Sequence, residues 1–96
     1  MSQIRFEWDS RKAKTNEKKH GISFEEAQSV FYDEQALLLE DPRPLHEEER
    51  FILLGLSRSL RILVVVHALR DSDVIRIISA RRATRLETRE YEIRLR

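Results

Sequence analysis

Residues 61–68 read Arg-Ile-Leu-Val-Val-Val-His-Ala and form the most apolar run of the sequence. The run is short and rich in β-branched residues, which is typical of a central strand buried on both faces. A hairpin turn is expected at 70–73 and a last strand at 74–80. A strand is also expected at about 49–57, with a short connection at 58–60. Strands joined by such short connections are expected to pair antiparallel.

Two helices are expected before this region. Asp9 has the position of an N-cap, and the lysine-rich helix after it should end near His20, with Gly21 as the C′ residue. Residues 23–26 form a capping box, in which the serine accepts from the last glutamate's N–H and that glutamate reaches back. The helix that begins there should end around Asp33. Its apolar residues form one stripe: Phe24, Ala27, Val30 and Phe31.

Two more strands and a C-terminal helix complete the order. Residues 4–8 alternate apolar and polar side chains, and residues 36–40 are mostly leucine. The two prolines of 41–44 break the chain after that strand. A second capping box at 84–87 begins a helix that should end near Leu95. The sequence therefore predicts an α+β fold, in which a twisted, mainly antiparallel sheet packs with two N-terminal helices and one C-terminal helix.

The composition is that of one small globular domain, residues 1–96, with 41% hydrophobic and 36% charged residues. The absence of cysteine excludes disulfides, cysteine zinc sites and thiol nucleophiles. No apolar run approaches the roughly 20 residues that span a bilayer. No secretory signal is visible either. We therefore expect a cytoplasmic protein without a membrane partner.

The net charge of +1 conceals a strong pattern along the chain. Residues 1–22 carry six bases and three acids, residues 23–50 carry two and nine, and residues 51–96 carry ten and five. Basic ends around an acidic middle suit a protein that holds differently charged partners on different surfaces. A solvated surface of salt bridges would give the same pattern.

Most common catalytic and cofactor motifs are missing. None of His20, His46 and His67 belongs to an HExxH or HxH pattern, so we expect no metal site. The sequence has no glycine-rich phosphate loop and no nucleophile elbow, which disfavours nucleotide-dependent and acyl-transfer chemistry. No cofactor is expected. His67 fits a catalyst or a hydrogen-bonded residue of the sheet, and His20 fits catalysis or capping of the helix before Gly21.

Arginines are the more informative residues. Arg76 interrupts the apolar strand at 74–80, and Arg81 and Arg82 follow it. Strict alternation would place Ile75, Ile77, Ser79 and Arg81 on one face, and Arg76, Ile78 and Ala80 on the other. A guanidinium group suits bidentate contact with phosphate, because its planar fork stays charged. The alternative is that Arg50, Arg76 and Arg81 form structural ion pairs with Glu47, Glu48, Glu49 or Glu87.

Three segments together resemble the BrnT toxin family. They are Phe-Glu-Trp-Asp at 6–9, Lys-His-Gly-Ile-Ser-Phe-Glu-Glu-Ala at 19–27 and Arg-Ile-Ile-Ser-Ala-Arg-Arg-Ala-Thr at 76–84. Further matching residues run from Lys12 to Tyr91, so the resemblance covers almost the whole chain.

The resemblance implies a toxin of a type II toxin–antitoxin module, with a RelE-like fold and a ribonuclease activity that stops translation. It also implies a ribbon-helix-helix, BrnA-like antitoxin, which would form a 2:2 complex and bring the toxin to operator DNA indirectly. The acidic stretch from Asp33 to Glu49 could dock the basic parts of that antitoxin or simply lie in solvent.

RNA can be cleaved without a metal when its 2′-OH attacks the adjacent phosphate. Under this mechanism the candidates for phosphate and transition-state binding are Arg76 and Arg81, followed by Arg50 and Arg70. His67 and Glu49 are candidate general bases, and Tyr91 is a candidate acid or stacking residue. Candidate RNA contacts are Lys19, His20, Arg70 and Arg82. The alternative is a module that binds nucleic acid or docks a protein without catalysis.

Overall fold

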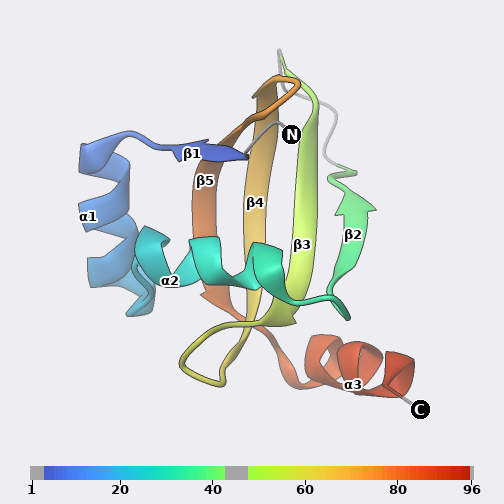
Figure 1. Ribbon diagram of the computed structural model, residues 1–96. Helices are drawn as coiled ribbons and strands as arrows, with labels where there is room; N and C mark the ends of the chain where they lie inside the picture. Colours follow the sequence, from blue (N-terminus) through green and yellow to red (C-terminus); the bar gives the residue numbers. More distant parts are fainter. Residues whose placement is uncertain (1–3, 43–47, 96) are drawn as a thin grey trace.

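The computed structural model describes residues 4–42 and 48–95, which form one sheet with three α-helices against it (Figure 1). In chain order the elements are β1 (Arg5–Glu7), α1 (Ser10–His20), α2 (Phe24–Ser29), the 3-10 helix η1 (Val30–Tyr32), β2 (Leu37–Glu40), β3 (Arg50–Leu56), β4 (Ile62–Asp71), β5 (Val74–Arg82) and α3 (Arg85–Arg94). This order confirms the predicted α+β class. In this part of the chain no helix is both long and apolar enough to cross a membrane.

The five strands of the sheet have the order β1-β5-β4-β3-β2. The predicted central strand is indeed β4, which pairs antiparallel with β3 and with β5. Only β1 pairs in parallel, with β5. The turn expected at 70–73 is shorter than predicted, because Asp71 pairs with Val74 and leaves only Ser72 and Asp73 in the turn. The hairpin therefore extends further than the apolar run alone indicates.

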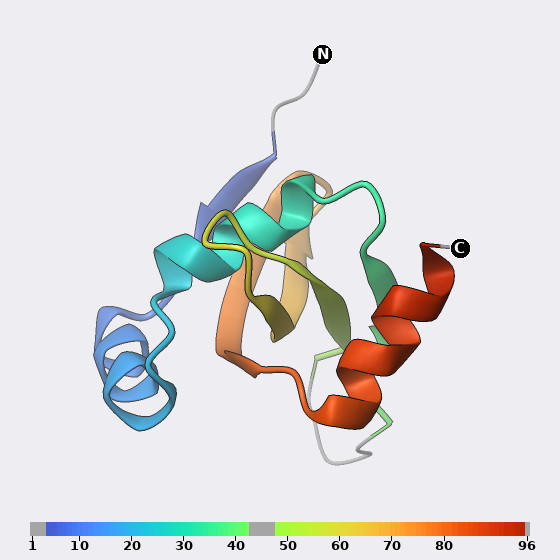
Figure 2. The same ribbon diagram turned by 90° about the horizontal axis from the view of Figure 1, so that it is seen from below.

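Helices cover the two faces of the sheet unequally (Figure 2). On the helix-side face, α2 and η1 lie across the strands. The main core is on this face and comprises Ile22, Phe24, Ala27, Val30, Leu53, Leu63, Val65, Ile77 and Ala80. On the other face, which we call the open face, α3 lies at one end and packs Tyr91 against Leu54 and Val64. The rest of the open face is available to position functional side chains.

A β-bulge interrupts the pairing of β4 with β5. Val66 pairs with Ser79 and the next residue, His67, pairs with Ile77, so Ile78 is an extra residue on β5. An extra residue shifts the alternation of side chains between the two faces by one position.

The bulge corrects the predicted faces of β5. Ile77 and Ala80 both belong to the helix-side core, although strict alternation separates them. Arg76, Ser79 and Arg81 all pair with β4 residues of the open face. The prediction that Arg76 and Arg81 lie on opposite faces is therefore wrong.

The ends of α1 follow the sequence signals. The Asp9 carboxylate accepts hydrogen bonds from the N–H groups of Arg11 and Lys12, at 2.8 and 3.2 Å. Gly21 ends the helix with a φ of 72°, a conformation that glycine adopts at no steric cost. Both predicted caps are confirmed.

Only one of the two hydrogen bonds of the capping box predicted at 23–26 is present at the start of α2. Ser23 accepts from the Glu26 N–H at 3.0 Å, as predicted. The Glu26 side chain does not reach back, because it is buried and accepts from the Ser57 hydroxyl at 2.7 Å and from the Arg61 guanidinium. The predicted bond from the Glu26 side chain is therefore wrong, because tertiary contacts use this side chain to tie α2 to the turn between β3 and β4.

Asn16 joins α1 to the exposed edge of β5. The strand β1 pairs only with residues 74–76 of β5, so the edge beyond them needs other partners. The Asn16 amide donates to the Ala80 carbonyl at 2.8 Å, and its oxygen accepts from the Ala80 N–H at 3.1 Å. It also donates to the Ile22 carbonyl at 3.0 Å. This one buried side chain takes the place of a neighbouring strand at that point.

Candidate functional site

Three of the predicted arginines share the open face. Arg50 of β3 and Arg76 of β5 both pair with Ala68 of β4, so their side chains project from the same face with one strand between them. Arg81 lies further along β5, opposite Val64. The face therefore presents three guanidinium groups, an arrangement that suits a polyanion.

Two of these arginines form the structural ion pairs that the sequence left open. Arg76 contacts Glu48, with both side chains about one-third exposed. Arg81 donates to both oxygens of Glu87, at 2.8 and 2.9 Å, and also to the Arg82 carbonyl at 3.1 Å. Of the other suggested partners, Glu47 lies outside the described residues.

These ion pairs leave donors for a ligand. A guanidinium group has five N–H bonds, and three of those of Arg81 point at protein oxygens. Partly exposed ion pairs contribute only about 0–1 kcal/mol, so a phosphate can compete with Glu48 for Arg76. The buried Nε of Arg50 has no hydrogen-bond partner among the described residues. Such an unpaired buried donor is rare in proteins.

A second group of bases lies on α1, next to this face. One hollow of about 400 Å³ on the open face is lined by His20, Asp41, Pro42, Ile52, Val64, Val66, Ser79 and Arg81. A second hollow of about 320 Å³ is lined by Arg11, Lys12, Thr15, Asn16, Lys19, His20, Ile78 and Ser79. Because His20 and Ser79 line both, the two hollows adjoin each other. We call them together the basic groove.

The two histidines that the sequence offered as candidates, His20 and His67, lie in different places. His20 lies in the basic groove, where it adjoins Arg81 and Lys19. His67 projects from the opposite face of the sheet, with its ring centroid 4.8 Å from that of Phe31 and 5.9 Å from that of Phe51. Burial lowers the pKa of His67, which favours the neutral ring. The structure does not bring His67 together with the arginines.

Tyr91 is buried between α3 and the sheet and does not lie at the surface of the protein. Its ring is only 4% exposed, and its hydroxyl donates to the Asp33 carboxylate at 2.6 Å. Burial and this hydrogen bond raise the pKa of Tyr91 to about 12. Asp33 also accepts from the N–H groups of Leu56 and Gln35, so it joins α3 to β3 and to the segment before β2. In this structure Tyr91 anchors α3 and does not reach the basic groove.

We expect Tyr91→Phe to lower the free energy of unfolding by about 1.5–3 kcal/mol, the usual contribution of a hydrogen bond to a charged group. The substitution keeps the ring and removes only the bond to Asp33. Urea unfolding followed by circular dichroism measures the change. Tyr32→Phe is the matched control, because Tyr32 is 70% exposed. Equal midpoints for the two variants would contradict the anchoring role.

The remaining predicted residues lie around the edge of this region. Glu49 is exposed and directly precedes Arg50 at the start of β3. Arg70 is exposed and pairs with Glu7 at 2.9 Å. Arg82 is exposed at the end of β5, opposite Leu63, on the helix-side face. In sequence, Glu49 adjoins Arg50 and Arg82 adjoins Arg81, whereas Arg70 adjoins no arginine of the open face.

Glu87 holds Arg81 and caps α3 with the same carboxylate. It accepts from the Thr84 N–H at 2.8 Å, while Thr84 accepts from the Glu87 N–H, so the second predicted capping box is confirmed. The hydrogen bonds from Arg81 lower the pKa of Glu87 to about 2, against the opposing effect of burial and with help from Thr84. The orientation of Arg81 therefore depends on the start of α3.

This shift predicts a pH-dependent stability. Because the folded-state pKa is depressed from 4.5 to about 2, the stabilisation is complete above pH 4.5 and is lost as the pH falls toward 2. We expect Glu87→Gln to be less stable than the wild type at pH 7, and the difference to shrink between pH 4.5 and 2. Urea midpoints across this range measure it, with the exposed Glu90→Gln as control. A difference that stays constant over the range would contradict the assignment.

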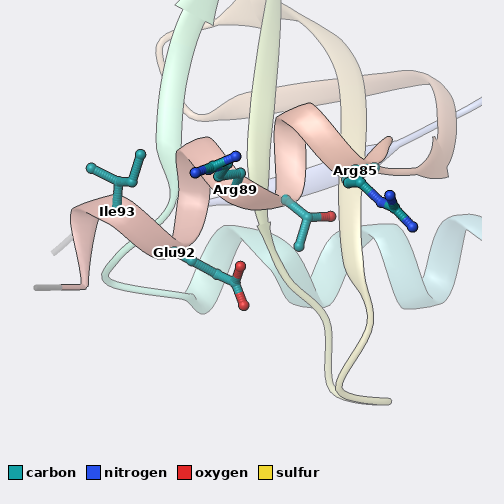
Figure 3. A pocket seen from close by; sticks show the side chains of 6 residues that line it. Arg85, Arg89, Glu92 and Ile93 are labelled. Atoms are coloured by element: carbon teal, nitrogen blue, oxygen red, sulfur yellow. The ribbon is translucent and has the colours of Figure 1, made fainter.

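Another hollow lies on α3 and lacks the features of a site (Figure 3). It has a volume of about 550 Å³, and apart from Ala83 its lining comes from α3 alone. Arg85 and Arg89 point in different directions in this view. We use these two arginines as controls for the arginines of the open face. Among residues 4–42 and 48–95, no cluster of three or more His, Asp or Glu side chains could hold a metal ion.

Sequence reasoning missed two residues that shape the groove. Ser79 lies where the two hollows meet, but it is not among the residues predicted for the site, although strict alternation places it on the same face as Arg81. Asn16 belongs to no motif, although it fixes α1 against β5. Its position one helical turn after Ala13, the apolar residue of α1, is the signal that could have found it.

Known proteins resemble this chain in sequence and in fold. A model of the family described as “Ribonuclease toxin, BrnT, of type II toxin-antitoxin system” matches residues 8–87. The 1.1 Å crystal structure of the Brucella abortus ribonuclease toxin BrnT is similar, with a TM-score of 0.65 and 25% identity over 86% of this chain and 100% of that one. No curated protein gives a significant sequence match. The family match extends from the residue before the α1 cap to the first turn of α3.

Proposed function

The chain belongs to the BrnT family of type II toxin–antitoxin ribonuclease toxins, and on this premise we propose that it is a metal-independent endoribonuclease whose RNA lies in the basic groove. The observation that carries the proposal is the bulge at Ile78. The bulge puts Arg76 and Arg81 on the same face as Arg50, and Arg81 shares a hollow with His20 at the end of the lysine-rich helix α1.

Each part of the groove has its own task. Lys12 and Lys19 of α1 bind phosphates of the RNA backbone, which contributes affinity without reading sequence. Arg81, which lines the groove, holds the phosphate that is cleaved, and Arg76, further along β5 on the same face, binds a neighbouring phosphate. Because a guanidinium group donates from fixed positions, it can stabilise the extra negative charge of the phosphorane transition state.

The reaction needs only groups of the RNA and of this chain. The 2′-oxygen attacks the adjacent phosphorus while its proton passes to a general base, and the bond from phosphorus to the 5′-oxygen breaks. The leaving 5′-oxygen takes up a proton. The products are a 2′,3′-cyclic phosphate and a 5′-hydroxyl end, with no redox change.

We assign the proton transfers to residues at the groove. His20 is the histidine that adjoins Arg81, and a neutral imidazole ring has one nitrogen that accepts a proton and one that carries a proton. Glu49, beside Arg50, is the second candidate base. His67 is left out of this assignment because it lies on the opposite face of the sheet. Tyr91 is left out because it is buried between α3 and the sheet.

A cleavage assay tests the proposal. We expect the purified chain to cut a single-stranded RNA in the presence of EDTA, and to leave a 2′-O-methyl version of the same RNA intact. His20→Ala should lower the rate, whereas Thr15→Ala, a neutral change in the same groove, should not. RNA that is retarded in a gel but never cut would favour the alternative, a module that binds nucleic acid without catalysis.

As a member of a type II family, the chain has an antitoxin as partner. We propose that this partner is a ribbon-helix-helix, BrnA-like protein that forms a 2:2 complex in the cytoplasm. Through it, the toxin would be held on operator DNA. Co-purification with the protein encoded by the adjacent gene, followed by light scattering, measures the stoichiometry.

A further inference from the structure

The helix-side face carries an apolar hollow that the ribonuclease proposal does not use. It has a volume of about 340 Å³, and its walls include Phe31, Leu38, Phe51, His67 and Leu69. Most ligand pockets have volumes of about 300–1,000 Å³, so the hollow can take one large side chain. It lies on the opposite side of the sheet from the basic groove.

Apolar side chains at this hollow are unusually exposed. Leu38 is 58% exposed and Leu69 is 55% exposed, although both adjoin buried strands. The apolar surface continues through Phe31 to Phe6, whose ring centroids are 5.1 Å apart, and on to Tyr32, which is 70% exposed. Exposed apolar surface that continues into a hollow is typical of a protein–protein contact site.

His67 supplies a polar atom within these apolar walls. The residue is 3% exposed, and its Nδ1 lies 3.4 Å from the Val65 carbonyl. The His67 ring lines the hollow. If Nδ1 donates to the carbonyl, Nε2 is the acceptor nitrogen of the neutral ring. The walls of the hollow therefore hold one polar ring among apolar side chains.

The charges around the hollow are acidic. Asp33 lines it, Glu34 follows, and Glu40 pairs with Phe51 on the same face. Among the described strand residues, the helix-side positions carry no lysine or arginine except Arg82, at the end of β5 remote from the hollow. Such a surface repels RNA and attracts a basic protein. The sheet thus separates a basic face from an acidic, apolar one.

We propose that this hollow is where the antitoxin docks, through a large apolar side chain flanked by lysine or arginine residues. The inference rests on membership of the toxin family, which requires such a partner. An anchor that fills a pocket while basic residues meet an acidic rim has the arrangement of an interface hot spot. A side chain with an N–H or O–H group, such as tryptophan or tyrosine, would also be able to donate to the His67 ring.

The test measures binding of the antitoxin encoded by the adjacent gene to the full-length toxin by calorimetry. We expect the double variant Leu38→Ser/Leu69→Ser to raise the Kd about tenfold to a hundredfold, since both side chains border the hollow. Leu60→Ser and Leu86→Ser are matched controls, because these leucines are 79% and 74% exposed away from it. The double variant should cut RNA at the wild-type rate and arrest growth even with antitoxin present.

Other results would overturn the inference. An unchanged Kd for a folded double variant rules out docking here, as does a loss of RNA cleavage with antitoxin binding intact. A toxin that is dimeric alone, and monomeric as the double variant, would show that the occupant is a second copy of this chain. If the wild type cuts no RNA but the double variant loses antitoxin binding, the docking site stands and the nuclease proposal fails.

Discussion

Arg81→Ala is expected to slow RNA cleavage by about 10²- to 10³-fold, the usual loss when one preorganised donor to a transition-state charge is removed. Arg81 lines the groove beside His20 and is held by two hydrogen bonds to Glu87. Because those bonds fix the guanidinium plane before RNA arrives, the group does not need to reorganise as the phosphorane forms. The loss should fall mainly on kcat, with a smaller change in KM.

Arg81→Lys separates charge from geometry. A lysine keeps the positive charge but cannot reproduce the planar fork, so we expect most of the loss to remain. Arg85→Ala and Arg89→Ala are the matched controls, since both remove an exposed arginine from α3 outside the basic groove. Cleavage rates on a defined RNA and growth arrest in cells are the two measurements. Circular dichroism checks that each variant is folded.

The ion pair between Arg81 and Glu87 allows a second variant to test how Arg81 acts. If the pair holds Arg81 in position, Glu87→Gln should lower kcat, while the freed positive charge should tighten RNA binding and lower KM. If the pair only competes with phosphate, kcat should not fall. A folded Arg81→Ala variant that cleaves at the wild-type rate would refute the role of this residue, and with it the central part of the ribonuclease proposal.

Most elements of the fold could be predicted because each has a local cause. The apolar run at 61–68 becomes the central strand, and the caps at Asp9, Gly21 and Thr84 lie where the sequence places them. The bulge could not be predicted, since Ile77 and Ile78 suit either face equally. A single extra residue then decides whether the arginines of β5 act together.

The site was less predictable than the fold because it depends on tertiary contacts. His20 and His67 look alike in sequence as isolated histidines, and only the arrangement of α1 and β4 puts one in the groove and the other among phenylalanines. The carboxylates of Glu48 and Glu87 were foreseen as possible partners of the arginines. Only the structure shows that Arg76 and Arg81 bind these carboxylates and still lie on the open face.

Asn16→Ala should destabilise the fold by about 3 kcal/mol or more, because each buried backbone group left without a partner costs about 1–3 kcal/mol. The amide serves both the N–H and the carbonyl of Ala80, and also the carbonyl of Ile22, all of them buried. Urea unfolding measures the loss, with Thr15→Ala as the neighbouring exposed control.

The same substitution should also weaken RNA binding under conditions where the variant is still folded. Asn16 holds α1 against β5, and this contact keeps Lys19 and His20 beside Ser79. When this contact is lost, the basic residues of α1 are no longer held in a fixed position relative to the arginines of the open face. We expect a higher KM and a weaker dependence of binding on salt, because fewer phosphates are contacted at once. A variant that is less stable yet binds RNA with wild-type affinity and salt dependence would show that α1 holds the fold together without taking part in binding.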